Sequence, residues 1–212
     1  MVWSFAKPNW LPHQAREHQA ARERVALFDQ SSFAKILVQG RDAGPWLDGL
    51  CSADLSDAAM HDGKLVYTAL LNDAGGMESD CTVTRIAWDT FMLVTSTGQA
   101  TRDLHWLRRS LEGQRDFVTL TDVSGAFAVL SLMGPSSRQL LQRCTSADVS
   151  NAAFPFGCSR EIDLGYALVR ANRVTYVGEL GWELYVPAEF AAAVYETLHS
   201  KAKGDGKEQV SG

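Results

Sequence analysis

A short polar turn constrains the fold of this chain more than any other feature. The segment Asn72-Asp73-Ala74-Gly75-Gly76 separates two runs with strand character, residues 63–71 and 77–85. A glycine-rich connection of this length joins strands that run antiparallel, because a parallel crossover needs a dozen or more residues. Helical and extended segments are interspersed along the rest of the chain. The sequence therefore predicts an α+β fold with mixed, mainly antiparallel sheets and packed helices, not a doubly wound parallel sheet.

Periodicity and turn residues predict the other elements. Helices are expected over residues 12–26 and 101–111, in a short segment capped by Asp42, and after Pro135 and Pro187, with Pro135 at the first helical position. Further strands are expected over residues 33–38, 91–95, 117–121, 127–132 and 161–170, the last as one strand. Residues 3–10 are predicted to form an extended arm, because Pro8 disfavours a helix there.

Charge and composition exclude several classes of protein. The formal net charge is −5 and no basic stripe is present, which argues against a nucleic-acid partner. No apolar run approaches the length of a membrane span, and the first ten residues lack the features of a secretory signal. No glycine pattern typical of a flavin, dinucleotide or phosphate loop occurs. We therefore expect no nucleic-acid or membrane partner and a cytoplasmic location, with the mitochondrial matrix as the alternative.

The four cysteines are scattered through the sequence. Cys51, Cys81, Cys144 and Cys158 form no Cys-x-x-Cys pair. Their spacing therefore predicts reduced, buried thiols in an intracellular protein and neither a disulfide framework nor a metal site.

The segment over residues 173–187, RVTYVGELGWELYVP, places a single carboxylate between two glycines. Gly178 and Gly181 allow a sharp turn around Glu179, which predicts a strand, a tight turn and a second strand with Glu179 at the tip. Hydrophobic residues alternate with others after the turn, which predicts a half-buried second strand. A carboxylate in a glycine turn is more often solvated than functional, so the motif alone leaves both readings open.

A second acidic residue follows the Gly-Gly turn. On a regular strand from Met77, the residues Glu78, Asp80, Thr82 and Thr84 share one face, and Cys81 and Val83 share the other. The acidic face could line a wet cavity or meet bulk solvent, and spacing alone favours solvent.

Both segments resemble one known family. Residues 176–183, YVGELGWE, resemble the glycine–glutamate signature of the folate-binding aminomethyltransferases, which include the glycine-cleavage T-protein and the folate domains of dimethylglycine and sarcosine dehydrogenases. Val177 and Trp182 are closer to the dehydrogenase branch. Residues 70–80, LLNDAGGMESD, resemble the family segment that ends in an acidic pair, with Ser79 where T-proteins carry a first aspartate. Residues 28–35, 64–67 and 132–135 match further family segments in the same order.

The resemblance implies roles for four residues. Asp80 corresponds to the catalytic carboxylate, and Glu179 to the residue that grips the pterin ring of tetrahydrofolate. Such a ring presents adjacent N–H donors, which a carboxylate accepts side by side. Tyr67 and Tyr176 would form walls of the folate pocket. The resemblance also implies the aminomethyltransferase type of folate-binding domain, over residues 27–200, after an N-terminal arm and helix at 1–26 and before a polar tail at 201–212.

The activity implied is transfer of a methylene group to tetrahydrofolate. The donor would be an iminium from an oxidised methylamine or an aminomethyl group on a lipoyl arm, and FAD would be needed only in a separate flavin domain or flavoprotein partner. A non-catalytic module, like the regulatory subunit of pyruvate dehydrogenase phosphatase, is the alternative. An iron–sulfur assembly relative would require a cysteine near Val177, which is absent. The family continues into an arginine-bearing helix and a barrel domain, so we expect a C-terminally truncated domain with an open pocket.

Overall fold

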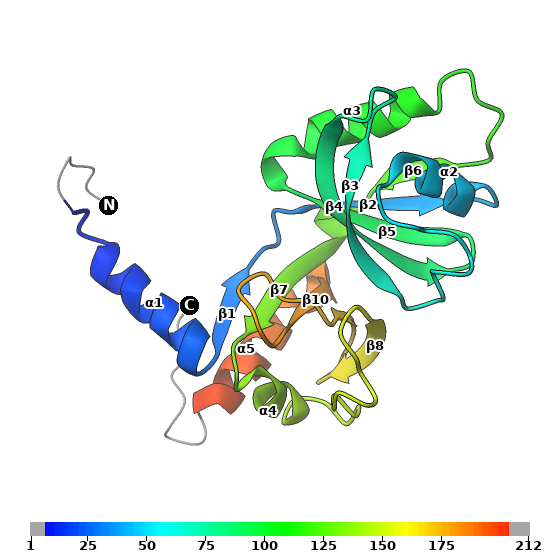
Figure 1. The fold of residues 1–212 in the computed structure, drawn as a ribbon. Coiled ribbons are helices and arrows are strands. Elements are labelled where there is room, and N and C mark those ends of the chain that lie inside the picture. Colours follow the sequence, from blue (N-terminus) through cyan, green and yellow to red (C-terminus); the bar gives the residue numbers. More distant parts are fainter. Residues whose placement is uncertain (1–6, 204–212) are drawn as a thin grey trace. The chain divides into compact units, whose positions relative to one another are not determined.

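The computed structural model of the chain describes residues 7–203. Within that range the chain forms two compact units. The first unit contains residues 7–30, 129–156 and 161–203, and the second contains residues 31–128 and 157–160. Figure 1 shows the elements of both.

The second unit is built on a five-stranded sheet with the order β3-β4-β5-β2-β6. Its strands are β2 (Ala34–Gln39), β3 (Leu65–Leu71), β4 (Met77–Ala87), β5 (Thr90–Thr95) and β6 (Thr119–Asp122). Every neighbouring pair in this sheet is antiparallel, and β3 and β4 form the predicted hairpin. The turn closes on Asn72, whose side-chain Oδ1 accepts hydrogen bonds from the backbone N–H groups of Ala74 and Gly76.

Two helices complete the hydrophobic core of the second unit. They are α2 (Ala43–Leu50) and α3 (Ala100–Ser110), the latter preceded by the short η1 (Thr97–Gln99). Leu47 of α2 and Leu107 of α3 are buried in the same cluster as Val83 and Leu93 of the sheet. The prediction that the Asp42 side chain caps α2 is wrong, because it makes no capping hydrogen bond. Its carboxylate instead accepts a 2.8 Å hydrogen bond from the backbone N–H of Phe117, far along the chain.

The first unit carries the other five-stranded sheet, with the order β1-β7-β10-β9-β8. Its strands are β1 (Ala26–Asp29), β7 (Phe127–Met133), β8 (Ser159–Leu164), β9 (Ala167–Asn172) and β10 (Gly181–Pro187). The pairs β1–β7 and β9–β10 are antiparallel. The helices are α1 (Leu11–Glu23), α4 (Ser137–Gln142) and α5 (Ala191–Lys203), with α5 following η3 (Ala188–Phe190).

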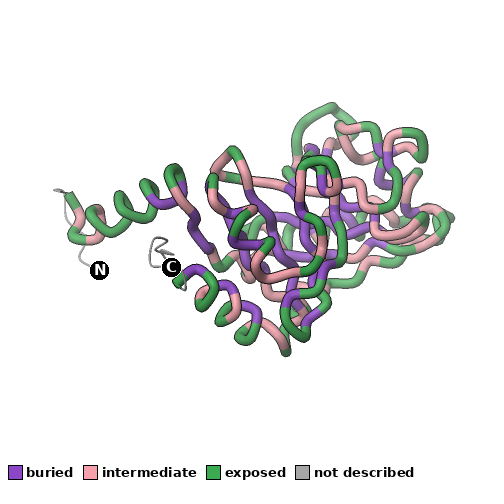
Figure 2. The backbone as a smooth tube through the Cα atoms, turned by 90° about the horizontal axis from the view of Figure 1, so that it is seen from below, coloured by how far each residue is buried: buried purple, intermediate pink, exposed green. Residues whose placement is uncertain are grey.

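The helices of the first unit differ in how many of their side chains are buried. Val194, Leu198 and Ala202 form the inner face of α5, as the hydrophobic spacing predicts. In α1 only Ala20 and Ala21, near its C-terminal end, are buried (Figure 2). Within the described residues, no helix is long and apolar enough to cross a membrane.

Four local predictions for the first unit are wrong. The helix predicted to reach Ala26 ends at Glu23, because Ala26 pairs with Met133 as the start of β1. The single strand predicted over residues 161–170 is the hairpin β8–β9, which turns at Gly165, where φ is +64°. Pro135 is not the first helical residue, since α4 begins at Ser137. No strand forms over residues 174–177.

The fifth difference concerns β10. The alternation after Gly181 predicts a half-buried strand, but residues 181–186 are all buried. The reason is the position of β10 in the sheet, where it lies between β7 and β9 and is covered on both faces. The predicted arm and tail lie partly outside the described residues, and residues 201–203 are helical as the end of α5.

Candidate functional site

In the second unit, Tyr67 and Asp80 form a hydrogen-bonded pair on the β3–β4 hairpin. The strand register places Tyr67 opposite Thr82 and Ala69 opposite Asp80, so the two side chains are diagonal neighbours on one face. The Tyr67 hydroxyl donates a 2.6 Å hydrogen bond to Asp80 Oδ2. Asp80 is exposed, and Tyr67 is 69% exposed. The face of the hairpin therefore exposes a carboxylate whose orientation is fixed by the hydroxyl of Tyr67.

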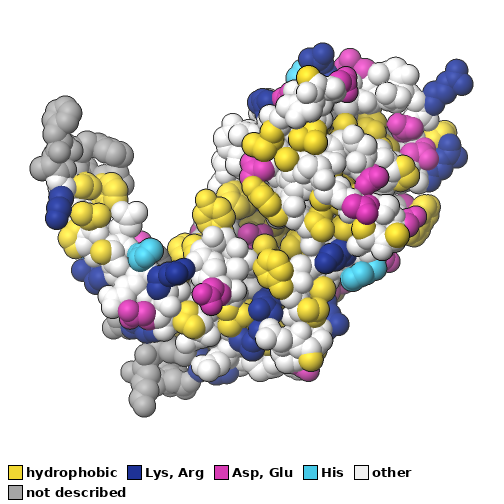
Figure 3. All heavy atoms as spheres, in the orientation of Figure 1, with side chains coloured by type: hydrophobic (Ala, Val, Ile, Leu, Met, Phe, Trp, Pro, Cys, Tyr) yellow, Lys and Arg dark blue, Asp and Glu magenta, His cyan; other side chains and the backbone are white. Residues whose placement is uncertain are grey.

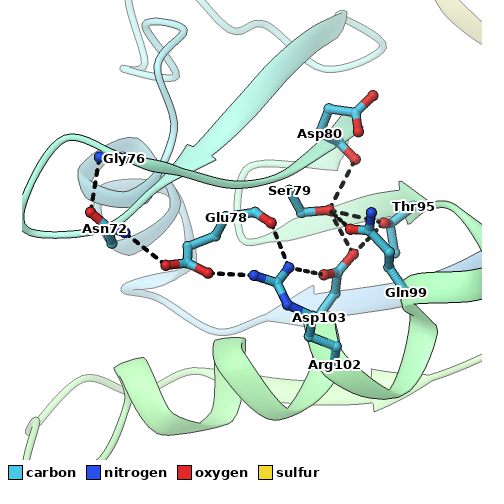
Figure 4. A network of polar contacts seen from close by, with 9 residues as sticks. All are labelled: Asn72, Gly76, Glu78, Ser79, Asp80, Thr95, Gln99, Arg102 and Asp103. Atoms are coloured by element: carbon cyan, nitrogen blue, oxygen red, sulfur yellow. Dashed lines mark hydrogen bonds and ion pairs between the residues drawn. The ribbon is translucent and has the colours of Figure 1, made fainter.

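On the other face of β4, directly beside Asp80, Ser79 joins a buried polar cluster (Figure 4). Its Oγ lies 2.8 Å from both Asp103 Oδ2 and Gln99 Oε1. The same Asp103 oxygen accepts a hydrogen bond from the hydroxyl of Thr95 in β5. This cluster connects β4, β5 and α3 underneath Asp80. The backbone at Asp80 is therefore held in place by contacts on the opposite face of the sheet.

Glu78 does not share the face of Asp80, contrary to the prediction from simple alternation. The register shifts between Leu70 and Leu71, so that Leu70 pairs with Ser79 and Leu71 with Met77, leaving Glu78 as the extra residue of a β-bulge. Its carboxylate forms a 2.6 Å ion pair with Arg102 and accepts a 2.7 Å hydrogen bond from Asn72 (Figure 4). Thr84 is also buried. This face of β4 therefore carries one exposed acidic side chain, that of Asp80, and the predicted row of acidic and hydroxyl side chains is not formed.

In the first unit, Glu179 lies in the loop between β9 and β10. Hydrogen bonds to the backbone hold residues 177–180 of this loop at three points. Arg22 Nη1 donates to Val177 O at 2.9 Å, the Gly178 N–H donates to Thr175 Oγ1 at 2.8 Å, and the Gly134 N–H donates to Leu180 O at 2.9 Å. The Glu179 carboxylate is exposed and makes no hydrogen bond or ion pair to any residue in the described range. Its oxygens are therefore available to a ligand.

A cavity of about 310 Å³ adjoins this loop. Its walls are Arg22, Pro135, Gly178, Glu179 and Leu180. Tyr176 belongs to the same loop and is 87% exposed, but it does not line this cavity. The cavity therefore combines one cation and one anion with the apolar side chains of Pro135 and Leu180.

The first residues of β10, the strand that follows the loop, make buried contacts with polar and charged side chains. Trp182 lies close to two guanidinium groups, with Arg173 4.7 Å and Arg138 5.2 Å from its ring. Burial, and then the charge of Arg138, lower the pKa of Arg173. The Tyr185 hydroxyl donates a 2.8 Å hydrogen bond to Glu183. These contacts anchor the start of β10 and hence one end of the loop.

The Glu183–Tyr185 pair is shielded from water. Burial raises the pKa of Glu183, with the hydrogen bond from Tyr185 acting in the opposite direction. Burial, followed by the charge of Glu183, raises the pKa of Tyr185 well above its ordinary value. In the sequence both residues fit an alternating strand, and no local pattern indicates that they form a pair.

The four sequence-predicted residues thus form two pairs. Tyr67 and Asp80 meet directly in the second unit, whereas Tyr176 and Glu179 share a loop in the first unit. Arg22 and Asp103 were missed, because their contacts join residues distant in the sequence and leave no local pattern. Within residues 7–203, no three His, Cys, Asp or Glu side chains gather in a way that could hold a metal ion.

Comparison with known proteins identifies the family. The model of the GCVT N-terminal domain matches residues 1–210. The chain belongs to this folate-binding domain family. The predicted fold is confirmed with it: an α+β arrangement with two five-stranded antiparallel sheets and packed helices, matching that of a solved aminomethyltransferase.

Three relatives show how the domain is used elsewhere. The chain is 38% identical, over 92% of its length, to 4-methylaminobutanoate oxidase (formaldehyde-forming) of Paenarthrobacter nicotinovorans, of which it covers 23%. It is 36% identical to human mitochondrial sarcosine dehydrogenase, over 92% of this chain and 22% of that protein. The structure resembles the glycine cleavage system aminomethyltransferase T of Bartonella henselae with a TM-score of 0.76 and 27% identity, over 92% of this chain and 50% of that one. The family relationship is therefore clear, and the chain spans only part of each relative.

Proposed function

We propose that this chain is a tetrahydrofolate-binding domain that transfers a methylene group. The observation that carries the proposal is the Tyr67–Asp80 hydrogen bond on the exposed face of the hairpin. The strand that carries Asp80 is also held by the buried Ser79–Asp103 hydrogen bond on its opposite face, which a carboxylate serving only solubility would not require. An exposed carboxylate with a fixed orientation is suited to act on a reacting group.

The available groups fit a reduced folate. The 2-amino-4-oxo edge of its pterin ring offers adjacent N–H donors, and the Glu179 carboxylate can accept two such bonds. Glu179 also lies in a cavity wall with apolar neighbours, Pro135 and Leu180, which favour a flat ring over bulk water. Tyr176, exposed in the same loop, is proposed as a further wall residue.

Asp80 is proposed to act at the reacting centre. When bound, tetrahydrofolate supplies the secondary amine that accepts the one-carbon unit. The Tyr67 hydroxyl occupies Asp80 Oδ2, and Oδ1 accepts no hydrogen bond from any described residue. The carboxylate can therefore stabilise positive charge on an incoming iminium and hold a proton released during transfer. Tyr67 would keep the carboxylate in one orientation throughout.

The donor is proposed to be a small methylamine, oxidised by a flavoprotein. The names of the two curated relatives, an oxidase that forms formaldehyde and a sarcosine dehydrogenase, support this choice. Any FAD would belong to another domain or to a partner protein.

The test separates binding from transfer. Calorimetry with tetrahydrofolate should show that Glu179→Gln weakens binding by about 1.5–3 kcal/mol, the scale of a hydrogen bond to a charged group. Asp80→Asn should bind tetrahydrofolate like the parent but form methylene-tetrahydrofolate more slowly when a flavoprotein supplies oxidised N-methylglycine. Glu196→Gln, an exposed acid on α5, is the control for charge alone.

Two results would count against the proposal. Equal tetrahydrofolate affinity for the parent and Glu179→Gln would remove Glu179 from the site. No measurable binding by the parent would favour the alternative, a non-catalytic interaction module.

A further inference from the structure

Arg22 connects the N-terminal helix of the first unit to the loop that carries Glu179. Its Nη1 donates a 2.9 Å hydrogen bond to the backbone carbonyl of Val177, 155 positions later in the sequence. Val177 is two residues before Glu179. Arg173, at the start of the same loop, donates to Asn151 and to the Phe154 carbonyl, whereas Arg22 bonds the loop next to Glu179.

The end of α1 from which Arg22 extends is itself fixed within the first unit. Ala20 and Ala21 are buried there. The Ser136 N–H donates a 2.8 Å hydrogen bond to the Arg24 carbonyl. A side chain at Gly134 would come within 3 Å of the Ala21 and Arg24 carbonyl oxygens, so the two backbones are in close contact. Arg22 therefore reaches the loop from a rigid base.

The other two contacts bond the loop backbone at Gly178 and Leu180, on the C-terminal side of Val177. The Thr175 hydroxyl holds the Gly178 N–H within the loop, and Gly134 holds Leu180 at its end. Thr175 is itself in contact with β7, where its Oγ1 lies 3.2 Å from Met133 Sδ. Among the described residues, however, neither contact bonds the backbone of Tyr176 or Val177 to the body of the unit directly. The hydrogen bond from Arg22 does so, and Arg22 and Glu179 are both walls of the same cavity.

We propose that Arg22 is a positioning residue for the Glu179 carboxylate. By holding Val177, Arg22 restricts the loop to the conformation in which Glu179 lines the cavity, so that less ordering is required when a ligand binds. This inference rests on the proposed function for its ligand, a reduced folate. The hold of Arg22 on the loop is a property of the free protein.

The experiment compares three variants of the full chain. Arg22→Ala removes the guanidinium from an exposed helical position, where alanine favours the helix. Arg22→Lys keeps a charged donor on a flexible side chain. Arg16→Ala is the matched control, because Arg16 lies on the same helix and its guanidinium bonds His13 within that helix.

Two measurements are made on each variant. Hydrogen–deuterium exchange of the free protein should be faster over residues 176–180 in Arg22→Ala, with β9 and β10 unchanged as internal references. Calorimetry should show tetrahydrofolate affinity reduced about tenfold in Arg22→Ala, as expected for losing one hydrogen bond from a charged donor at a partly screened site. Arg22→Lys should fall between Arg22→Ala and the parent in both measurements, and Arg16→Ala should match the parent.

Each outcome decides one of the two proposals. Unchanged exchange over residues 176–180 in Arg22→Ala would overturn the positioning role, whatever the affinity. Faster exchange with unchanged affinity would also overturn it, because the loop order would then not serve the ligand. Faster exchange in a protein whose parent form does not bind tetrahydrofolate would overturn the proposed function while upholding the hold of Arg22 on the loop.

Discussion

Ser79 and Asp103 are joined by a 2.8 Å hydrogen bond in the interior of the second unit, where their exposed fractions are only 3% and 1%. A buried carboxylate is costly unless donors surround it. Asp103 has such donors in Ser79, in Thr95 and, at 3.5 Å, in Arg102. Ser79 therefore has a structural role, because its hydroxyl donates to a buried carboxylate from α3.

Replacing Ser79 should therefore destabilise the second unit. Ser79→Ala removes one donor from the buried Asp103 carboxylate, and the expected loss is about 1–3 kcal/mol in the free energy of unfolding. Denaturant unfolding measures this loss. Ser110→Ala is the control, because Ser110 bonds only a carbonyl of its own helix, and it should change stability little. An unfolding midpoint for Ser79→Ala equal to that of the parent would show that the cluster does not depend on Ser79.

Removing the Tyr67 hydroxyl should affect chemistry more than stability. In Tyr67→Phe the exposed ring remains while Asp80 loses its hydrogen-bond donor. Methylene transfer should therefore fall roughly tenfold, equivalent to about 1.4 kcal/mol, with tetrahydrofolate affinity and the unfolding midpoint close to those of the parent. Tyr166→Phe, at the fully exposed β8–β9 turn, is the control. Equal transfer rates for both variants would leave Tyr67 without a role in orienting Asp80.

The buried Glu183 should make stability depend on pH. Burial raises its pKa in the folded state above the ordinary value of 4.5, so the folded protein holds this proton more tightly than the unfolded chain. The resulting stabilisation is fully present below that ordinary value and is lost as the pH rises through the folded-state pKa. The amide in Glu183→Gln has no such proton to lose.

Urea unfolding between about pH 4 and pH 7 measures this effect. The stability of Glu183→Gln relative to the parent should increase as the pH rises over that interval. Glu189→Gln, at an exposed position, should show a constant difference from the parent. A constant difference for Glu183→Gln as well would mean that Glu183 has the same pKa in the folded and unfolded chains.

The sequence predicted elements whose signals are local. The β3–β4 hairpin followed from the turn at residues 72–76, where Asn72 supplies its own hydrogen bonds. The burial of β10 could not be predicted in this way, because it depends on β7 and β9, which flank it in the sheet. The bulge at Glu78 was also hidden, since one extra residue reverses the face of a side chain without changing the composition.

The candidate site shows the same limit. Asp80 and Glu179 were found because each lies in a short motif. The Tyr67–Asp80 contact depends on strand register, and the Arg22–Val177 contact joins residues 155 positions apart. Gly165 was a missed local signal, since a glycine inside an apparent strand can mark a turn, and here it divides residues 161–170 into two strands.

Gly134 should be among the glycines least tolerant of substitution. Its φ is +119°, and an added Cβ would lie 2.6 Å from the Arg24 carbonyl oxygen and 2.9 Å from that of Ala21. Gly134→Ala should therefore lower the free energy of unfolding by about 3 kcal/mol, from backbone strain and overpacking together. Because the clash would push the end of α1 away, exchange over residues 176–180 should also become faster. Gly49→Ala is the control: Gly49 lies in α2 with open space around it, and alanine there should be neutral or stabilising by up to about 1 kcal/mol. If chemical denaturation finds the two variants equally stable, close packing of α1 against Gly134 is not required for stability. That result would also contradict the inference that this packing fixes the position of Arg22.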